Sequence, residues 1–181
     1  MKTTPLKIGK RTFALAFTAE ALADLEETVE GFDLGKVSET TKSMKTLLDA
    51  VAILAKAGED LEGRTLDVDR HWFGAHISPA PVSLAKVQIA VLNAFAEGFR
   101  MEAEAGEDED SPVDEVLEEL KKKRERLTWR KLMNYGLVAG LRWGEMRTLA
   151  PGLICDLYIY RLRYDDMEHG IMRKRERAYD M

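Results

Sequence analysis

The chain has 181 residues, 45% hydrophobic and 33% charged, a balance that excludes a disordered protein and favours one or two globular domains. No apolar run approaches the roughly 18 residues that cross a bilayer, and no basic and apolar leader opens the sequence. The single Cys155 excludes an internal disulfide, so we expect a protein of a reducing cytoplasm.

The net charge of −5 is unevenly distributed along the chain. Residues 1–102 carry −3 and residues 121–181 carry +7, whereas residues 103–120 hold nine acids and no base. Crowded acids repel one another, and "EAEAGEDEDSP" contains no large apolar residue that could pack. We therefore predict an N-terminal domain at 1–102, an acidic linker at 103–112 and a C-terminal unit at 113–181.

The first elements are predicted to be a β-hairpin that leads into a helix. "PLKI" and "RTFALAF" flank Gly9-Lys10, and glycine at the first central position is what a two-residue II′ turn requires. Phe13, Leu15 and Phe17 alternate with smaller residues, which places one apolar face on a core. Thr18 is the expected N-cap of a helix that ends near Gly31, with an inward stripe of Leu22, Leu25 and Val29.

Two longer helices follow in the N-terminal part. Apolar residues recur every three or four positions over 43–57, and Gly58 is the expected end of that helix. Trp72 and Phe73 are expected to fill the core, and Pro79 and Pro81 interrupt the chain. A helix beginning at Ser83 carries an apolar stripe of Leu84, Val87, Val91, Phe95 and Phe99.

The C-terminal unit is expected to be helical throughout. Ser111-Pro112 restarts a helix, Thr128 caps the next one, and Pro151 opens the last. Gly136 and Gly140 are interpreted as allowing a neighbouring helix to approach closely. The last helix carries an apolar seam with a 3.5-residue repeat, which predicts self-association: Leu153, Leu157, Tyr160, Tyr164, Met167 and Ile171. The fold class is thus mainly α with an N-terminal β-hairpin (α+β), in two small helical units joined by an acidic linker.

The chain contains little that indicates catalysis. His71 and His76 lie near Asp67 and Asp69, but a zinc site needs a further ligand at a recognisable spacing. Cys155 lies in an apolar helix with no histidine nearby in sequence, which favours a core position over a nucleophile. We find no phosphate-binding glycine loop and no hydrolase motif. We therefore expect no enzyme, no cofactor and no metal.

The basic stretch "LTWRKLMNYGLVAGLRWGEMRTLAPG" admits two functional interpretations. Its helix-turn-helix pattern and the positive charge around it suggest nucleic-acid binding. However, its second helix offers only Arg147 for reading bases, and the acidic segment before it would repel phosphate. Aromatic residues and methionine instead favour contact with protein, and the candidate contact residues are Trp129, Trp143, Met146 and Tyr158.

The two-part organisation resembles the tail assembly chaperones of long-tailed bacteriophages. The resemblance lies in "LKIGKRTFALAFTAEALADLEE", "SMKTLLDAVAILAKAG" and "LTWRKLMNYGLVAGLRWGEMRTLAPGLICDLYIYRLR". Within the last segment, "AGLRWGEMRTLAPGLICDL" is similar to the family's Gly-Leu turn, short acidic-led helix and proline-started helix. Together these segments cover most of the chain.

The resemblance implies a non-enzymatic chaperone made in the host cytoplasm. An N-terminal domain of this family coats the tape measure protein, a role in which Phe95 and Phe99 of the long helix would contact the partner. A C-terminal extension recruits tail tube subunits. Two alternatives remain open: a DNA-associated helical protein that uses the basic C-terminal unit, and a structural head–tail connector component.

Overall fold

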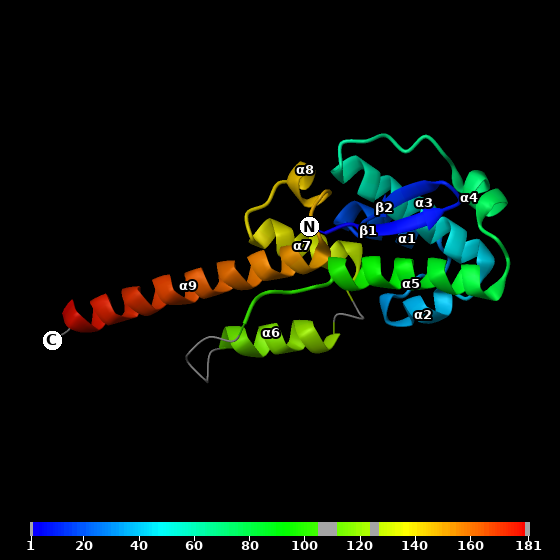
Figure 1. Cartoon of the computed structure of the whole chain (residues 1–181). Helices are drawn as coiled ribbons and strands as arrows, with labels where there is room; N and C mark the ends of the chain where they lie inside the picture. The colour runs from blue at the N-terminus through cyan, green and yellow to red at the C-terminus, as the bar shows by residue number, and fades with distance from the viewer. Residues whose placement is uncertain (1, 105–111, 124–126, 180–181) are drawn as a thin grey trace.

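The computed structural model describes residues 2–104, 112–123 and 127–179. It confirms a mainly α-helical fold with an N-terminal antiparallel hairpin (Figure 1). The elements are β1 (Thr4–Ile8), β2 (Arg11–Leu15), α1 (Ala19–Thr28), the 3-10 turn η1 (Leu34–Lys36), α2 (Val37–Thr40), α3 (Met44–Leu61), α4 (Arg70–His76), α5 (Pro81–Gly98), α6 (Pro112–Lys123), α7 (Trp129–Val138), α8 (Trp143–Met146) and α9 (Pro151–Tyr179).

The hairpin turns at Gly9-Lys10 as the sequence predicts. Leu6 pairs with Phe13 and Ile8 with Arg11, which leaves the two central residues of the turn between the strands. Gly9 has a φ of +60°, a conformation that costs glycine little. Phe13, Leu15 and Phe17 are buried, so the predicted inward face of the second strand is confirmed.

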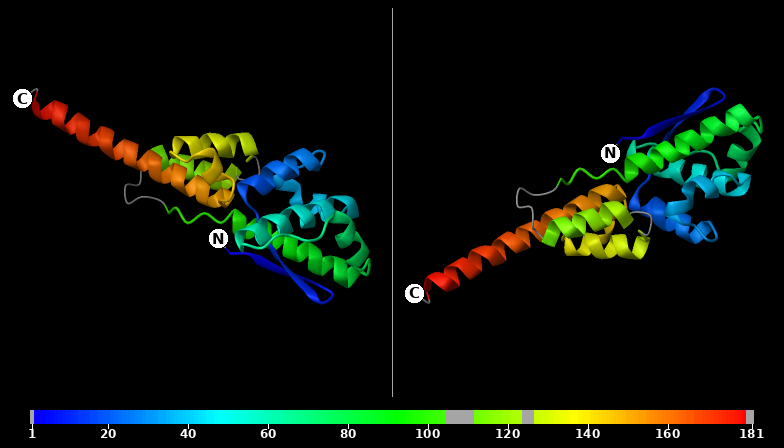
Figure 2. Two further views of the ribbon diagram at one scale, coloured as in Figure 1. Left: turned by 90° about the horizontal axis from the view of Figure 1, so that it is seen from above. Right: turned by 90° about the horizontal axis from the view of Figure 1, so that it is seen from below.

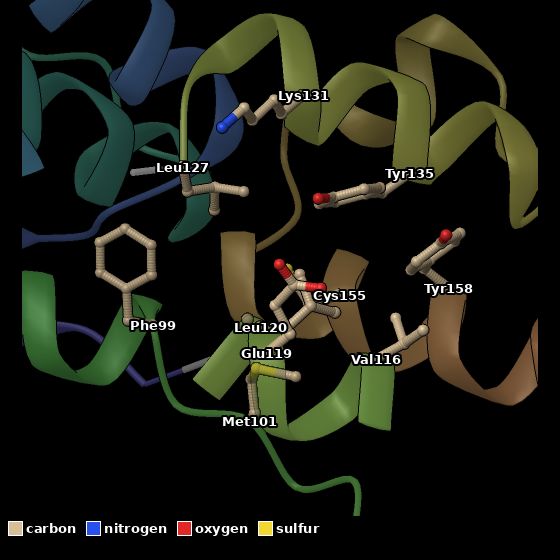
Figure 3. Close-up of a pocket in the computed structure, with 11 residues that line it drawn as sticks. Phe99, Met101, Val116, Glu119, Leu120, Leu127, Lys131, Tyr135, Cys155 and Tyr158 are labelled. Carbon is tan, nitrogen blue, oxygen red and sulfur yellow. The ribbon is translucent and has the colours of Figure 1, made fainter. Parts of the chain in front are cut away.

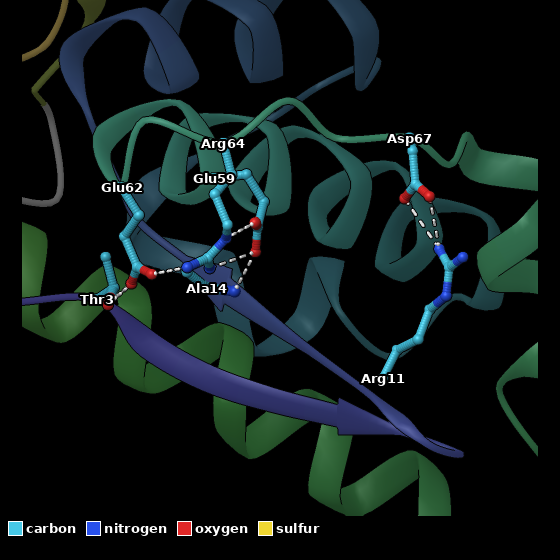
Figure 4. A network of polar contacts seen from close by, with 7 residues as sticks. All are labelled: Thr3, Arg11, Ala14, Glu59, Glu62, Arg64 and Asp67. Atoms are coloured by element: carbon cyan, nitrogen blue, oxygen red, sulfur yellow. Dashed lines mark hydrogen bonds and ion pairs between the residues drawn. The ribbon is translucent and has the colours of Figure 1, made fainter.

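Helix α3 covers the open edge of β2, which the sequence did not indicate. The Ala14 N–H donates to the Glu59 carboxylate at 2.7 Å (Figure 4). The Ala16 N–H donates to the Leu54 carbonyl at 3.0 Å. Ala14 and Ala16 are therefore buried, like Phe13, Leu15 and Phe17, with which they alternate. An edge strand closed in this way cannot pair with another chain.

The predicted end of this helix at Gly58 is wrong, because α3 continues to Leu61. A Cβ at position 58 would lie 2.2 Å from the Ala14 carbonyl oxygen, which is closer than a carbon and an oxygen that are not bonded can approach. Gly58 is therefore a packing position at which the helix backbone meets the strand, and it does not end the helix.

The remaining N-terminal helices complete the core around Phe17. Thr18 caps α1 as predicted, with its side chain accepting from the Ala21 N–H at 3.1 Å. Helix α5 begins at Pro81, two residues before the expected start. The Phe17 ring lies 4.6 Å from that of Phe95 and 5.0 Å from that of Phe99, measured between centroids.

The N-terminal and C-terminal parts share one hydrophobic core. Helix α1 begins against the α8–α9 connection, where the Ala19 N–H donates to the Leu149 carbonyl and the Glu20 N–H to the Arg147 carbonyl. The core that holds the hairpin also includes Leu127, Leu132, Met146, Ile154 and Cys155. The two predicted units are thus parts of one packed body.

Most of the predicted acidic linker, residues 105–111, lies outside the described residues. The chain that enters this segment is held in place, since the Asp156 carboxylate accepts from the Glu102 N–H at 2.8 Å and from the N–H of Ala103, the first linker residue, at 3.0 Å. Ala103 is buried in a second small cluster with Val113, Leu117 and Ile159, which joins α6 to α9.

Helix α9 passes along α6 and α7 and then extends beyond the other elements, as the views from above and below both show (Figure 2). Across the described residues, no helix has the length and apolar content needed to cross a membrane.

Candidate functional site

A pocket of about 420 Å³ lies where the end of α5 meets α6, α7 and α9 (Figure 3). Its walls are mainly apolar and aromatic, and Glu119 and Lys131 add one charge of each sign. Such a composition suits an apolar group that carries a few polar atoms. The lining residues are Phe99, Met101, Val116, Glu119, Leu120, Leu127, Lys131, Tyr135, Gly152, Cys155 and Tyr158.

Two tyrosines form one wall of the pocket. The rings of Tyr135 and Tyr158 stack with centroids 4.6 Å apart and planes 20° apart. Burial raises the pKa of Tyr135, so its hydroxyl keeps its proton at neutral pH. A stacked aromatic pair with a polar end presents a flat surface on which an apolar side chain can pack.

Cys155 lies at the pocket but is not prepared for covalent chemistry. Its side chain is buried, and burial, with a smaller effect of Asp156, raises the pKa of its thiol to about 12. The nucleophilic thiolate is therefore scarce at neutral pH. This agrees with the interpretation of Cys155 as a core residue.

The two candidate tryptophans contact each other at an edge-to-face angle. Their ring centroids lie 5.0 Å apart with an interplanar angle of 72°. Trp129 is half-buried, and its backbone N–H donates to the Glu26 carboxylate of α1 at 2.9 Å. Trp143 is 49% exposed at the start of α8. Of this pair, Trp143 is the one that offers surface to another molecule.

Two of the predicted contact residues lie in the core, so those predictions are corrected. Met146 is fully buried beside Gly136, where an added Cβ would lie 2.0 Å from the Met146 sulfur. Phe95 is 5% exposed, because the chain after β2 places Phe17 against it. The exposed apolar residues of α5 are Val82 and Ile89 instead.

Gly136 and Gly140, interpreted together from the sequence, have different roles. Gly136 admits the Met146 side chain, in agreement with a close approach by a neighbouring element. Gly140 has open space around it and a φ of +83°, and it lies in the turn after α7. The close-packing interpretation is therefore wrong for Gly140.

Helix α9 exposes the apolar seam predicted from its sequence. Leu153, Tyr160, Tyr164 and Met167 are 42–63% exposed, and Leu157 is half-buried. Ile171 lies among the residues whose side chains are not described. The side that packs on the body carries Ile154, Cys155 and Ile159 instead. The helix thus has apolar side chains on two faces, one covered and one open.

The polar residues considered for a metal site have other contacts. The His76 ring stacks on Trp72 at 4.0 Å and its Nδ1 lies 2.8 Å from the Trp72 carbonyl oxygen. Asp67 accepts from Arg11 at 2.9 Å, whereas Asp69 caps α4 by accepting from the Trp72 N–H. Within the described ranges, no group of three histidine, cysteine or acidic side chains could hold a metal ion.

The helix-turn-helix resemblance is limited to α7 and a very short α8. Arg147, the one base-reading candidate, directs its guanidinium to the Glu20 carboxylate of α1. That carboxylate raises the pKa of Arg147 and neutralises its charge locally. Helix α8 itself carries no lysine or arginine, and Arg147, which follows it, is engaged by α1.

The sequence did not identify most of the pocket. Val116 and Leu120 lie on α6 and Leu127 lies just before α7, and only the tertiary packing brings them beside Phe99 and Tyr158. The apolar row on 113–120 was a usable signal, because a short helix with one apolar face needs something to cover it.

Comparison with known proteins adds no family: no protein-family model matches this chain, and no curated protein or solved structure matches it either.

Proposed function

We propose that this chain is a non-enzymatic, protein-binding assembly factor of the tail assembly chaperone type. In this proposal it acts in the host cytoplasm, binds the tape measure protein and brings tail tube subunits to it. The resemblance of the segments quoted above suggests the class. A protein partner is supported by how apolar side chains are distributed over the C-terminal elements.

The observation that carries the proposal is a group of exposed apolar side chains on α7 and α8. Soluble proteins seldom expose many large apolar groups in one region, and such regions are commonly interaction sites. Aromatic residues contribute strongly there because they bury much area at low entropic cost. The exposed residues are Leu137, Val138 and Trp143.

The pocket offers a second kind of contact for the same partner. An apolar or aromatic side chain of an unfolded or helical segment would fit among Phe99, Leu120 and the Tyr135–Tyr158 pair. An exposed aromatic residue such as Trp143, together with a pocket that takes an anchoring side chain, is a common arrangement in protein interfaces.

Co-expression and pull-down test the proposal. The tagged full-length chain would be co-expressed with a tape measure protein encoded by the same genome. We expect co-purification of the two, and a Trp143→Ser variant to retain roughly a tenth or less of the bound partner, as for a central aromatic contact.

Met44→Ser at the start of α3 is the matched control, since Met44 is an apolar residue that is 39% exposed and belongs neither to α5 nor to the C-terminal elements. This variant should bind like the unmodified chain. Absence of any co-purified partner, or equal loss in both variants, would exclude the proposed surface. Adding the tail tube protein to the preformed complex tests the recruiting role separately.

A further inference from the structure

The exposed seam of α9 carries an inference beyond the proposed function. Leu153, Tyr160, Tyr164 and Met167 lie on the side of the helix opposite Cys155 and Ile159, which pack on the body. An apolar stripe on each of two opposite sides is unusual for a helix with only one covered face. The open stripe therefore needs a partner.

The spacing of the seam indicates a helix as the partner. Leu153, Leu157, Tyr160, Tyr164 and Met167 follow one another at four, three, four and three residues. This repeat keeps a row of side chains facing a second helix that runs along the first, and it matches a helix with the same repeat. A partner that offered a globular surface or an extended strand would not require this repeat of four and three residues.

We propose that two copies of this chain associate through α9, side by side and parallel, with the seam of each helix packed against that of the other. The seam begins at Leu153, close to the body, and continues along the part of α9 that extends past α6 and α7 (Figure 2). The pocket opens on the other side of the helix and stays accessible in the pair.

Charges beside the seam favour the parallel orientation. Arg163 flanks the seam on one side and Glu168, five residues later, flanks it on the other. In a parallel pair each Arg163 faces Glu168 of the second copy, the arrangement that stabilises parallel coiled coils. An antiparallel pair centred on Tyr160 and Tyr164 would instead place Arg161 against Arg161.

Arg163 is held beside the seam by contacts within its own chain. Its guanidinium donates to the Asp114 carboxylate at 2.8 Å and to the Glu104 carbonyl, and its side chain is 26% exposed. Little further side-chain entropy is lost when it meets a second carboxylate.

The dimer would also present two copies of Trp143, one from each chain. If Trp143 contacts a long partner, as proposed above, two copies strengthen that binding through multivalency.

Sedimentation equilibrium of the full chain tests the association. We expect the purified chain to reach twice its mass of 20.5 kDa as its concentration rises. Tyr164→Glu should weaken the pair by at least roughly 100-fold, because it places two carboxylates in an apolar seam. Val138→Glu on α7 is the control; Val138 is 51% exposed and outside the seam, so this variant should dimerise normally.

Cysteine crosslinking tests the orientation. Met167→Cys should form an intermolecular disulfide under mild oxidation, whereas His169→Cys, which points away from the seam, should not. The native Cys155 is buried and does not compete. A monomer at all concentrations, equal weakening by both glutamate variants, or equal crosslinking at positions 167 and 169 would overturn the proposal. None of these results depends on binding of a tape measure protein.

Discussion

At the residue scale, Glu59 is the side chain that joins the hairpin to α3. Its carboxylate is buried, accepts from the Ala14 N–H and pairs with Arg64 (Figure 4). The Arg64 guanidinium holds the pKa of Glu59 below its ordinary value. Ionised Glu59 therefore stabilises the fold above about pH 4.5, and this contribution is lost as the pH falls through the lower folded pKa.

We predict that Glu59→Gln lowers the free energy of unfolding by about 1–3 kcal/mol at neutral pH, since it weakens charge-assisted hydrogen bonds. Urea unfolding should show the difference shrinking as the pH falls below about 4.5 and then through the lower folded pKa of Glu59. Glu62→Gln is the control, because the Glu62 pair with Arg64 is more exposed and surface pairs contribute little. A destabilisation by Glu59→Gln that stays the same at every pH would contradict this account.

At the element scale, the contact between α3 and β2 depends on Gly58. An alanine there would gain about 1 kcal/mol in helix propensity but would force its Cβ against the Ala14 carbonyl. We predict that Gly58→Ala is destabilising overall by about 1–3 kcal/mol, measured by thermal unfolding. Gly144→Ala in α8 is the control, since open space surrounds that position. Gly144→Ala should leave the midpoint temperature of unfolding unchanged or raise it. A similar rise in Gly58→Ala would show that α3 and β2 do not pack so closely at this position.

At the scale of the whole molecule, the shared core makes the two predicted units interdependent. A chain ending at Lys123 loses Leu132, Met146 and Ile154, as well as the carbonyls that hold the start of α1. We predict that it unfolds at a much lower temperature than the whole chain, whose circular dichroism should show one cooperative transition. A chain ending at Glu168 keeps all of these groups and should unfold like the full chain. Two separate transitions in the full chain would instead indicate independent domains.

The sequence by itself determined the elements whose causes are local. The Gly9-Lys10 turn, the Thr18 and Thr128 caps and the alternation of Phe13, Leu15 and Phe17 each depend on a few neighbouring residues, and all are found in the structure. The α9 seam was also visible, because its repeat needs only one helix.

The tertiary structure alone decided which apolar residues are covered. From the sequence, Met146 and Trp143 were equally good candidates for an exposed contact residue. In the structure Met146 packs into the core against Gly136, whereas Trp143 stays at the surface. Gly58 has the sequence context of a helix end, but in the structure it packs against Ala14 of β2, far earlier in the chain. The pocket and the common core likewise join segments far apart in the chain. Local patterns cannot specify such contacts, because they depend on which surfaces meet once the whole chain has packed.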